Sequence, residues 1–210
     1  MWLSTRQVMG NTVYIASIDS IPADLLSDEF LTRLPLLEQA RISRLCRILD
    51  RKRSLLGLRL LEEAINNNNV TWNWDMFRRD WAGRPGIRKD RSRPGYDFNI
   101  SHSGDIVVCA IGPGRLGIDV EKVMPVDIND FYSVIPESAL KTILDSSRIE
   151  DEFFRLWTRI ESVIKADGSG FSVELDTIRI NANIATLGSE RWNYHDVDIA
   201  PGYACCLAYS

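Results

Sequence analysis

The sequence predicts an α+β protein made of two similar halves. Segments rich in β-branched and aromatic residues, typical of strands, lie between longer segments whose apolar residues recur at helical spacing. The order of elements in the second half resembles that in the first, and each half closes with a glycine followed by an apolar strand. We therefore expect two α+β halves, residues 1–114 and 115–210, related by a pseudo-dyad, with the functional site in the cleft between them.

The first half is expected to hold three strands and two helical segments. Pro35 breaks the first helical segment, and Asp50 is a favourable N-cap for the second. The asparagines at 66–69 end that second helix, because asparagine favours caps and turns over helix interiors. The expected ranges are 12–18, 96–100 and 106–111 for strands, 25–49 and 50–65 for helices, 83–86 for a polar loop and 101–104 for a turn.

The second half is expected to hold four strands and two helical segments. Its strongest helix runs from Ile149 to Asp167 and ends at Gly168-Ser169-Gly170, a pattern typical of a helix C-terminus. The other expected ranges are 130–144 for a helical stretch and 116–120, 177–184, 192–199 and 203–209 for strands.

Composition and charge exclude several classes of protein. The chain is 45% hydrophobic and 26% charged, which indicates a globular fold with its own core. It has no apolar run of about 18 residues, so we expect no membrane span, and its first residues lack the pattern of a signal peptide. A net charge of -4 argues against a general nucleic-acid binder. The four cysteines lack C-x-x-C spacing, so we expect reduced, largely buried cysteines in a cytoplasmic protein.

Charge is distributed unevenly along the chain. Residues 38–93 are net basic, whereas residues 117–210 are net acidic. This balance fits a cleft with an anion site on one wall and a cation site on the other. Solvated surfaces without any such function would produce the same pattern.

Two carboxylates alternate along the predicted strand Gly117-Ile-Asp-Val-Glu121. Because residues i and i+2 share one face of a strand, Asp119 and Glu121 point the same way and repel each other. A cation between them would relieve the repulsion, and their hard oxygen ligands suit Mg²⁺. Without a cation, removing one carboxylate is expected to be neutral or mildly favourable for stability. The alternative is an exposed face with two solvated acids.

The helix 149–167 carries a second candidate group. Trp157, Glu161 and Lys165 recur at four-residue spacing and so lie on one helical face. Glu161 before Lys165 is also the favourable order for an ordinary surface ion pair, which is the commoner role of such a spacing.

Candidate anion-binding residues lie in the first half. His102 follows Ser101 in the segment 98–104, where side chains and backbone N–H groups can converge on an anion. The cluster Arg51-Lys52-Arg53 opens a helix, where a bound anion would offset the unfavourable interaction of cations with the helix dipole. The alternative for His102 is simple packing in a turn, and the alternative for the basic cluster is a run of solvated charges without a ligand.

The order of these motifs resembles that in the 4′-phosphopantetheinyl transferases of the surfactin-synthetase-activating type. The resemblance extends from about Arg41 to Gly170. The segments that carry it are Arg53-Ser-Leu-Leu-Gly57, Gly83-Arg84-Pro85, Phe98-Asn-Ile-Ser-His-Ser-Gly104, Gly117-Ile-Asp-Val-Glu121 and the set Trp157, Glu161 and Lys165. The length is similar to that of the monomeric, two-half members of this family.

The resemblance implies a Mg²⁺-dependent transfer of the phosphopantetheine arm of coenzyme A to a serine of an acyl or peptidyl carrier protein. The serine attacks the β-phosphate, and 3′,5′-ADP leaves. In this chain the metal ligands would be Asp119, Glu121 and Glu161. Lys165 would meet charge on the leaving phosphate, and Glu161, or Glu137 through a water, would accept the serine proton. The coenzyme A contacts would come from Lys52, Arg53, Ser101, His102 and Lys165, with Arg84 and Pro85 lining the adenine.

One position departs from the family pattern. Ile160 stands where the family usually has lysine, next to Glu161. If a cation is missing near the phosphates, Ile160→Lys should raise the transfer rate modestly with a small loss of stability. The departure also leaves open a binding module that holds coenzyme A or a carrier protein without turnover. A metal-dependent nuclease built on the three carboxylates is a further alternative, which the acidic balance disfavours.

Overall fold

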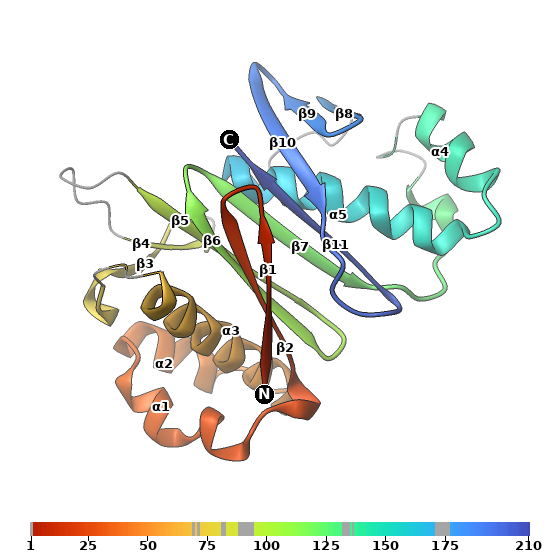
Figure 1. Cartoon of the computed structure of the whole chain (residues 1–210). Helices are drawn as coiled ribbons and strands as arrows, with labels where there is room; N and C mark the ends of the chain where they lie inside the picture. The colour runs from red at the N-terminus through yellow and green to blue at the C-terminus, as the bar shows by residue number, and fades with distance from the viewer. Residues whose placement is uncertain are drawn as a thin grey trace. The chain divides into compact units, whose positions relative to one another are not determined.

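The computed structural model describes residues 2–68, 70, 72–80, 83–87, 95–131, 135, 137–170 and 177–210. The chain forms two compact units, Met1–Gly114 and Arg115–Ser210, which are described separately below. In each unit a long helix packs against an antiparallel sheet (Figure 1), so the predicted α+β class is confirmed.

The sheet of the first unit has the strand order β1-β2-β6-β5. Its central strands, β2 (Asn11–Ser17) and β6 (Ile106–Pro113), are almost entirely buried. The edge strand β1 (Leu3–Val8) was not predicted from the sequence, because its exposed polar residues give no apolar alternation. The other edge strand, β5 (Tyr96–Ser103), is longer than predicted.

The turn predicted at 101–104 is wrong. Ser101 and His102 continue β5 and pair with Val108 and Val107 of β6. Only Gly104 and Asp105 form the turn, and Gly104 adopts a positive φ of 54° that suits glycine. Ser101 and His102 are therefore fixed by the sheet and not by a loop.

Three helices accompany this sheet: α1 (Asp28–Arg33), α2 (Leu36–Ser43) and α3 (Ile48–Asn67). The predicted break at Pro35 and the predicted end among the asparagines are confirmed. The predicted N-cap is wrong: α3 begins two residues before Asp50, with Arg47 at the cap position, and Asp50 instead pairs with Arg53. Short 3-10 turns occur at Ile18–Ser20, Ala23–Leu26 and Trp74–Met76.

The helix α3 lies close against the sheet because Gly57 has no side chain. A Cβ atom at Gly57 would lie 2.8 Å from Cγ2 of Ile100 in β5. The helix buries Leu56, Leu60 and Leu61 in the main apolar cluster of the unit. This packing fixes the N-terminal part of α3 near the end of β5 that carries His102.

A small hairpin follows α3. Its strands, β3 (Phe77–Arg79) and β4 (Pro85–Ile87), pair antiparallel, with Arg79 opposite Pro85. The polar loop predicted at 83–86 is thus partly wrong, because Pro85 and Gly86 belong to a strand. Proline is tolerated there because it is the first residue of β4.

The sheet of the second unit has the order β7-β11-β10-β9-β8. Its long strands are β7 (Leu116–Lys122), β10 (Glu190–Asp196) and β11 (Tyr203–Tyr209). The single strand predicted at 177–184 is wrong, since it is a hairpin of β8 (Ile178–Asn181) and β9 (Ile184–Leu187). Ala182, at a φ of 45°, turns the chain between them.

The helix α5 (Ile149–Asp167) has the predicted bounds, and Gly168 ends it in the left-handed conformation, with a φ of 81°. The helix packs along β7 and β11 (Figure 1). A 3-10 turn (Ile128–Phe131) and α4 (Glu137–Leu144) cover its first half and bury an aromatic cluster. The helical stretch predicted at 130–144 thus begins later than expected.

Three of the four cysteines are buried and all four are free, as expected, but Cys46 is exposed.

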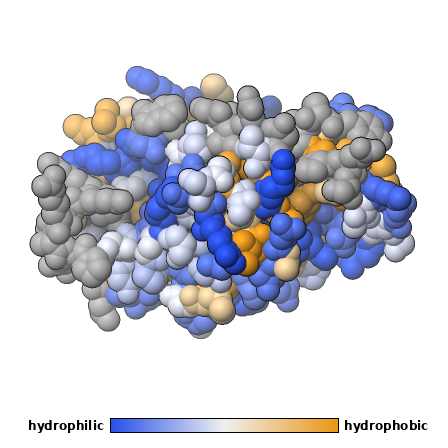
Figure 2. All heavy atoms as spheres, turned by 90° about the horizontal axis from the view of Figure 1, so that it is seen from above, coloured by the Kyte–Doolittle hydropathy of each residue, from blue (hydrophilic) through white to orange (hydrophobic). Residues whose placement is uncertain are grey.

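The surface in Figure 2 is mostly hydrophilic, with small apolar patches between charged and polar side chains. In the described part of the chain, no helix has the length and apolar character needed to span a membrane.

Candidate functional site

A close approach of β7 to α5 builds the carboxylate site of the second unit. A Cβ atom at Gly117 would lie 2.2 Å from the carbonyl oxygen of Ser162 and 2.3 Å from the amide nitrogen of Ala166. Only glycine fits this contact. Because strand residues alternate, Asp119 and Glu121 share the Gly117 face, so their side chains lie on the side of the strand that faces α5.

Asp119 forms an ion pair with Lys165. The Nζ atom of Lys165 lies 2.5 Å from Oδ1 of Asp119, and Asp119 is only 2% exposed. The carboxylate thus has a countercharge in the protein, which removes the premise that its loss would be neutral or favourable, so we now expect its removal to be destabilising. The pair is intramolecular and joins the strand that carries Asp119 to the last turn of α5.

Glu161 completes a cluster of ionisable groups. It is 9% exposed, and burial raises its pKa above the ordinary value. The positive charge of Lys165 opposes this shift, whereas the negative charges of Asp119 and Glu121 add to it. The structure thus brings together the four residues that the sequence placed on one strand and one helix: Asp119, Glu121, Glu161 and Lys165.

The chemistry of this cluster can be compared with the needs of Mg²⁺. No set of three or more His, Cys, Asp or Glu side chains in the described residues has the arrangement to hold a metal ion. However, Mg²⁺ commonly uses only one or two carboxylates and takes its remaining ligands from water and substrate phosphates. The buried oxygen donors and the raised pKa of Glu161 fit a partial site of this kind.

Trp157 has a structural role within the described residues. Its ring stacks on Phe153 at 6.2 Å between centroids and meets Phe131 edge-on at 5.4 Å. These contacts join the 3-10 turn that precedes α4 to the helix α5. Trp157 is therefore part of the aromatic cluster that holds these two elements together.

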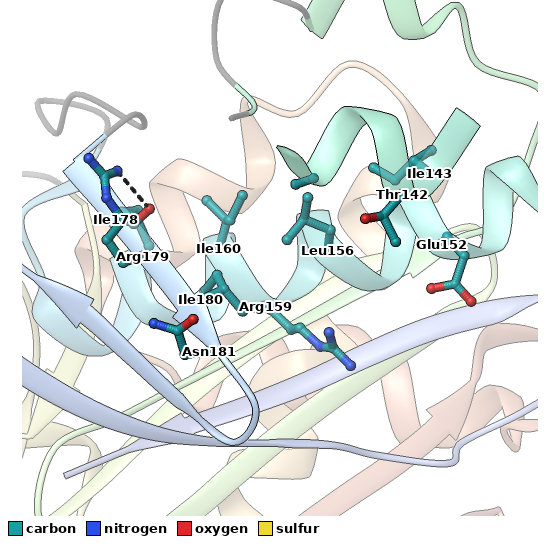
Figure 3. Close-up of a pocket in the computed structure, with 11 residues that line it drawn as sticks. Thr142, Ile143, Glu152, Leu156, Arg159, Ile160, Ile178, Arg179, Ile180 and Asn181 are labelled. Carbon is teal, nitrogen blue, oxygen red and sulfur yellow. Dashed lines mark hydrogen bonds between the residues drawn. The ribbon is translucent and has the colours of Figure 1, made fainter. Parts of the chain in front are cut away.

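Ile160 lies in a different environment from the carboxylate cluster. It is 2% exposed and packs with Ile164 and Ile178. It lines a cavity of about 330 Å³ between α4, α5 and β8. Figure 3 shows Leu156 and Ile180 beside it. The isoleucine is thus a core residue of the α5–β8 contact.

In the first unit, Arg53 is attached to the turn after β5. Its Nε and Nη2 atoms donate to the carbonyl oxygen of Gly104 at 3.0 and 2.6 Å, and its Nη1 atom donates to Asp50 at 3.1 Å. His102, two residues before Gly104, is exposed, whereas Ser101 is buried. The structure therefore brings Arg53 to the β5–β6 turn, next to the strand end that carries His102.

The remaining predicted residues lie at three other places. Lys52 is exposed and, with Arg51, borders a second cavity of about 330 Å³ at the start of α3. Arg84 donates from Nη2 to Oδ2 of Asp97 at 2.7 Å, directly before Pro85. Glu137 is the first residue of α4, and its side chain lies outside the described part of the structure.

Sequence reasoning did not identify Glu38. This residue of α2 is 3% exposed and accepts hydrogen bonds from Arg41 and from Arg79 of β3. Burial raises its pKa, but the hydrogen bonds and charges of Arg79 and Arg41 outweigh that effect, so its pKa lies below the ordinary value. The pairing of Glu38 with Arg79 has no local sequence signal, because the two residues are far apart in the chain.

Comparison with known protein families gives two matches that together span most of the chain. The N-terminal model of the 4′-phosphopantetheinyl transferases matches residues 24–113, and the model of the 4′-phosphopantetheinyl transferase superfamily matches residues 115–208.

Individual relatives are also named phosphopantetheinyl transferases. The 4′-phosphopantetheinyl transferase gsp of Aneurinibacillus migulanus is 30% identical over 190 residues, which is 82% of this chain and 76% of the relative. The 4′-phosphopantetheinyl transferase Sfp of Bacillus subtilis (strain 168) is 33% identical over 62% of this chain and 58% of the relative. The human L-aminoadipate-semialdehyde dehydrogenase-phosphopantetheinyl transferase is 29% identical over 69% of this chain and 51% of the relative.

Proposed function

Because the chain belongs to the 4′-phosphopantetheinyl transferase superfamily and is a transferase, we propose that it converts apo- to holo-carrier proteins. The serine oxygen of an acyl or peptidyl carrier protein forms a bond to the β-phosphorus of coenzyme A. The bond from that phosphorus to the bridging oxygen breaks, and 3′,5′-ADP leaves. The observation that carries the proposal is the cluster of two buried carboxylates, Asp119 and Glu161, with the half-buried Lys165.

We propose that Asp119, Glu121 and Glu161 would hold Mg²⁺ only together with the pyrophosphate of coenzyme A and water, because no three such side chains among the described residues are arranged to hold the ion by themselves. The ion would neutralise the phosphate charge and polarise the phosphorus towards attack. Its support in this chain is the burial of the Asp119 and Glu161 carboxylates on facing sides of β7 and α5.

The protein groups have separate roles in the proposed reaction. Glu161 accepts the serine proton, because it is a carboxylate of the same cluster and lies on α5 one turn before Lys165. Glu137, acting through a water, is the alternative base. Lys165 moves from Asp119 to the charge that develops on the leaving phosphate, and this motion is supported by its partial exposure of 28%.

The first unit would bind the nucleotide part of coenzyme A. Arg53 and His102 bind the 3′-phosphate in this proposal, with Lys52 and Ser101 beside them, and Arg84 and Pro85 line the adenine. The contact of Arg53 with the Gly104 carbonyl supports the pairing of Arg53 with His102.

Mass spectrometry of apo-carrier proteins tests the function. Incubation with coenzyme A and Mg²⁺ should add the mass of one phosphopantetheine to a serine, and Asp119→Asn should abolish the gain. A panel of fatty acid, polyketide and nonribosomal peptide carriers would identify the substrate. Binding of coenzyme A without any mass gain across the panel would contradict the transferase proposal and favour the non-catalytic binding module.

We also propose that the protein acts in the cytoplasm as a monomer, without nucleic acid or membrane partners. The net charge of -4 supports the absence of nucleic-acid binding. Light scattering after gel filtration, and binding assays with DNA and lipid vesicles at physiological salt, would test these points.

A further inference from the structure

A buried ion pair joins α2 to the β3–β4 hairpin. The guanidinium of Arg79 donates from Nε to Oε1 of Glu38 at 2.6 Å and from Nη2 to Oε2 at 3.0 Å. Arg41 donates to the same Oε2 at 3.0 Å. Glu38 is 3% exposed, so this bidentate, charge-assisted ion pair is shielded from water.

Arg79 also holds the turn of the hairpin. Its third nitrogen, Nη1, donates to the carbonyl oxygen of Gly83 at 2.7 Å. Its guanidinium carbon lies 5.6 Å from the centre of the Phe77 ring, which restricts the side chain further. A single arginine thus connects the buried carboxylate of α2 to the residue directly before Arg84.

The backbone and the side chain of Arg84 also form hydrogen bonds of their own. Its backbone N–H donates to Oδ1 of Asp80 at 2.9 Å, and its carbonyl oxygen accepts from the N–H of Asp80 at 3.0 Å. Its side chain donates to Asp97 at the start of β5. The backbone of Arg84 therefore has a defined position, and the Arg79 contact with Gly83 is the link from that position to α2.

We propose that Glu38 and Arg79 are positioning residues that hold Arg84 and Pro85 in place to receive the adenine of coenzyme A. The inference rests on the proposed function and goes beyond it, since neither residue contacts the substrate in this proposal. The planar guanidinium of Arg79 bonds the Glu38 carboxylate and the Gly83 carbonyl at once. It therefore fixes both the distance and the orientation of the hairpin turn relative to α2. Loss of either partner should loosen the turn and weaken nucleotide binding without altering the chemical step.

The first unit contains a matched control. Glu62 of α3 is also buried, at 9% exposed, and accepts from two arginines, Arg33 and Arg59. Within the part of the chain that the structure describes, neither arginine forms a hydrogen bond or ion pair with the β3–β4 hairpin. Glu62→Gln therefore removes a buried charge of the same kind and measures the general cost of such a change.

The test is calorimetric titration of the full chain with 3′,5′-ADP and with coenzyme A. Arg79→Met should raise the Kd for 3′,5′-ADP about tenfold, equivalent to about 1.4 kcal/mol. Glu38→Gln, which retains an acceptor, should have a smaller effect in the same direction. Arg79→Lys should be intermediate, because a lysine cannot make the three contacts at once. Glu62→Gln should leave both Kd values within about twofold.

Transfer kinetics provide a second readout. In Arg79→Met the KM for coenzyme A should rise with its Kd, while kcat at saturating coenzyme A stays near the wild-type value. Equal Kd values in Arg79→Met, Glu62→Gln and wild type would overturn the positioning role while leaving the proposed function intact. If the wild type binds neither coenzyme A nor 3′,5′-ADP, the proposed function fails and the inference fails with it. Circular dichroism would identify a variant that does not fold, in which case Arg79→Lys decides.

Discussion

Lys165 and Asp119 are in contact across the boundary between α5 and β7, with 2.5 Å between Nζ and Oδ1. The Lys165 ammonium therefore balances the negative charge of the Asp119 carboxylate, which β7 and α5 together shield from water. In the proposed reaction the same ammonium is needed at the leaving phosphate, so the ion pair keeps Lys165 close to the position in which it would act.

Asp119→Asn should abolish transfer and also lower the stability of the protein without ligands. Lys165 loses its charged partner but keeps partial access to water, so the expected loss is about 1–3 kcal/mol in the free energy of unfolding. Urea denaturation measures this loss. Glu190→Gln, which removes a half-exposed partner of Arg115, is the control and should cost less than about 1 kcal/mol. An Asp119→Asn protein as stable as wild type would contradict the importance of the ion pair.

Gly117→Ala should separate β7 from α5. The added methyl group would meet backbone atoms of Ser162 and Ala166, which cannot rotate away, so we expect a loss of about 3 kcal/mol or more and a loss of transfer. A Cβ atom added at Gly86 would have no neighbouring atom within 4 Å, so Gly86→Ala should be close to neutral for stability. Thermal unfolding of both variants tests the close approach of β7 to α5. Equal unfolding midpoints in Gly117→Ala and Gly86→Ala would refute it.

Ile160→Lys should destabilise the protein and give no gain in rate. The family pattern alone predicts a faster enzyme, but Ile160 packs with Ile164 and Ile178 and is only 2% exposed. A lysine there must leave an apolar cluster or bury its charge, at a cost of about 2–4 kcal/mol. Ile160→Met, which keeps the apolar contact, should be nearly wild type. A higher transfer rate with an unchanged unfolding midpoint in Ile160→Lys would restore the original expectation.

Arg53→Ala should weaken coenzyme A more than dephospho-coenzyme A. Only the former carries the 3′-phosphate, and the loss of a charge-assisted contact to it should cost about 1.5–3 kcal/mol. Calorimetric titration of both ligands measures the difference. Arg33→Ala, which removes an arginine bonded to Glu62, controls for the general loss of an ion pair. An equal loss for both ligands would assign Arg53 to another part of coenzyme A.

Glu38 should make the protein acid-sensitive. Its pKa is lowered in the folded state, so its ionised form favours folding at pH values above its ordinary pKa of 4.5. This contribution is lost as the pH falls below 4.5 and through the lower, folded-state pKa. Urea unfolding from pH 7 downward should show a smaller loss in Glu38→Gln than in wild type. Parallel curves for the two proteins would show that Glu38 does not contribute.

Local sequence signals predicted the elements that carry the carboxylates. The helix α5 has its predicted bounds because its apolar spacing is regular and Gly168 ends it in the left-handed conformation. The strand β11 also has its predicted bounds. The β8–β9 hairpin was missed because its turn at Ala182 contains no glycine or proline, and the polar edge strand β1 was missed because it buries little.

The side-chain partners were less predictable than the elements. Strand alternation and helical spacing brought Asp119, Glu161 and Lys165 to the correct faces, but the sequence did not show that Lys165 bonds Asp119. Glu38 and Arg79 meet through tertiary packing alone, and no periodicity relates them. Long-range pairings of this kind depend on how elements pack, which local patterns do not encode.

The contact at Gly117 has a consequence for exchanging parts between relatives. All four ionisable groups of the carboxylate cluster reside on β7 and α5, and the absence of one side chain sets the separation of these two elements. A chimera that keeps residues 115–210 and takes its first 114 residues from another member would therefore retain the spacing of the carboxylates. If the two units have the proposed roles, such a hybrid would inherit its preference for the nucleotide from one parent and its acid–base groups from the other.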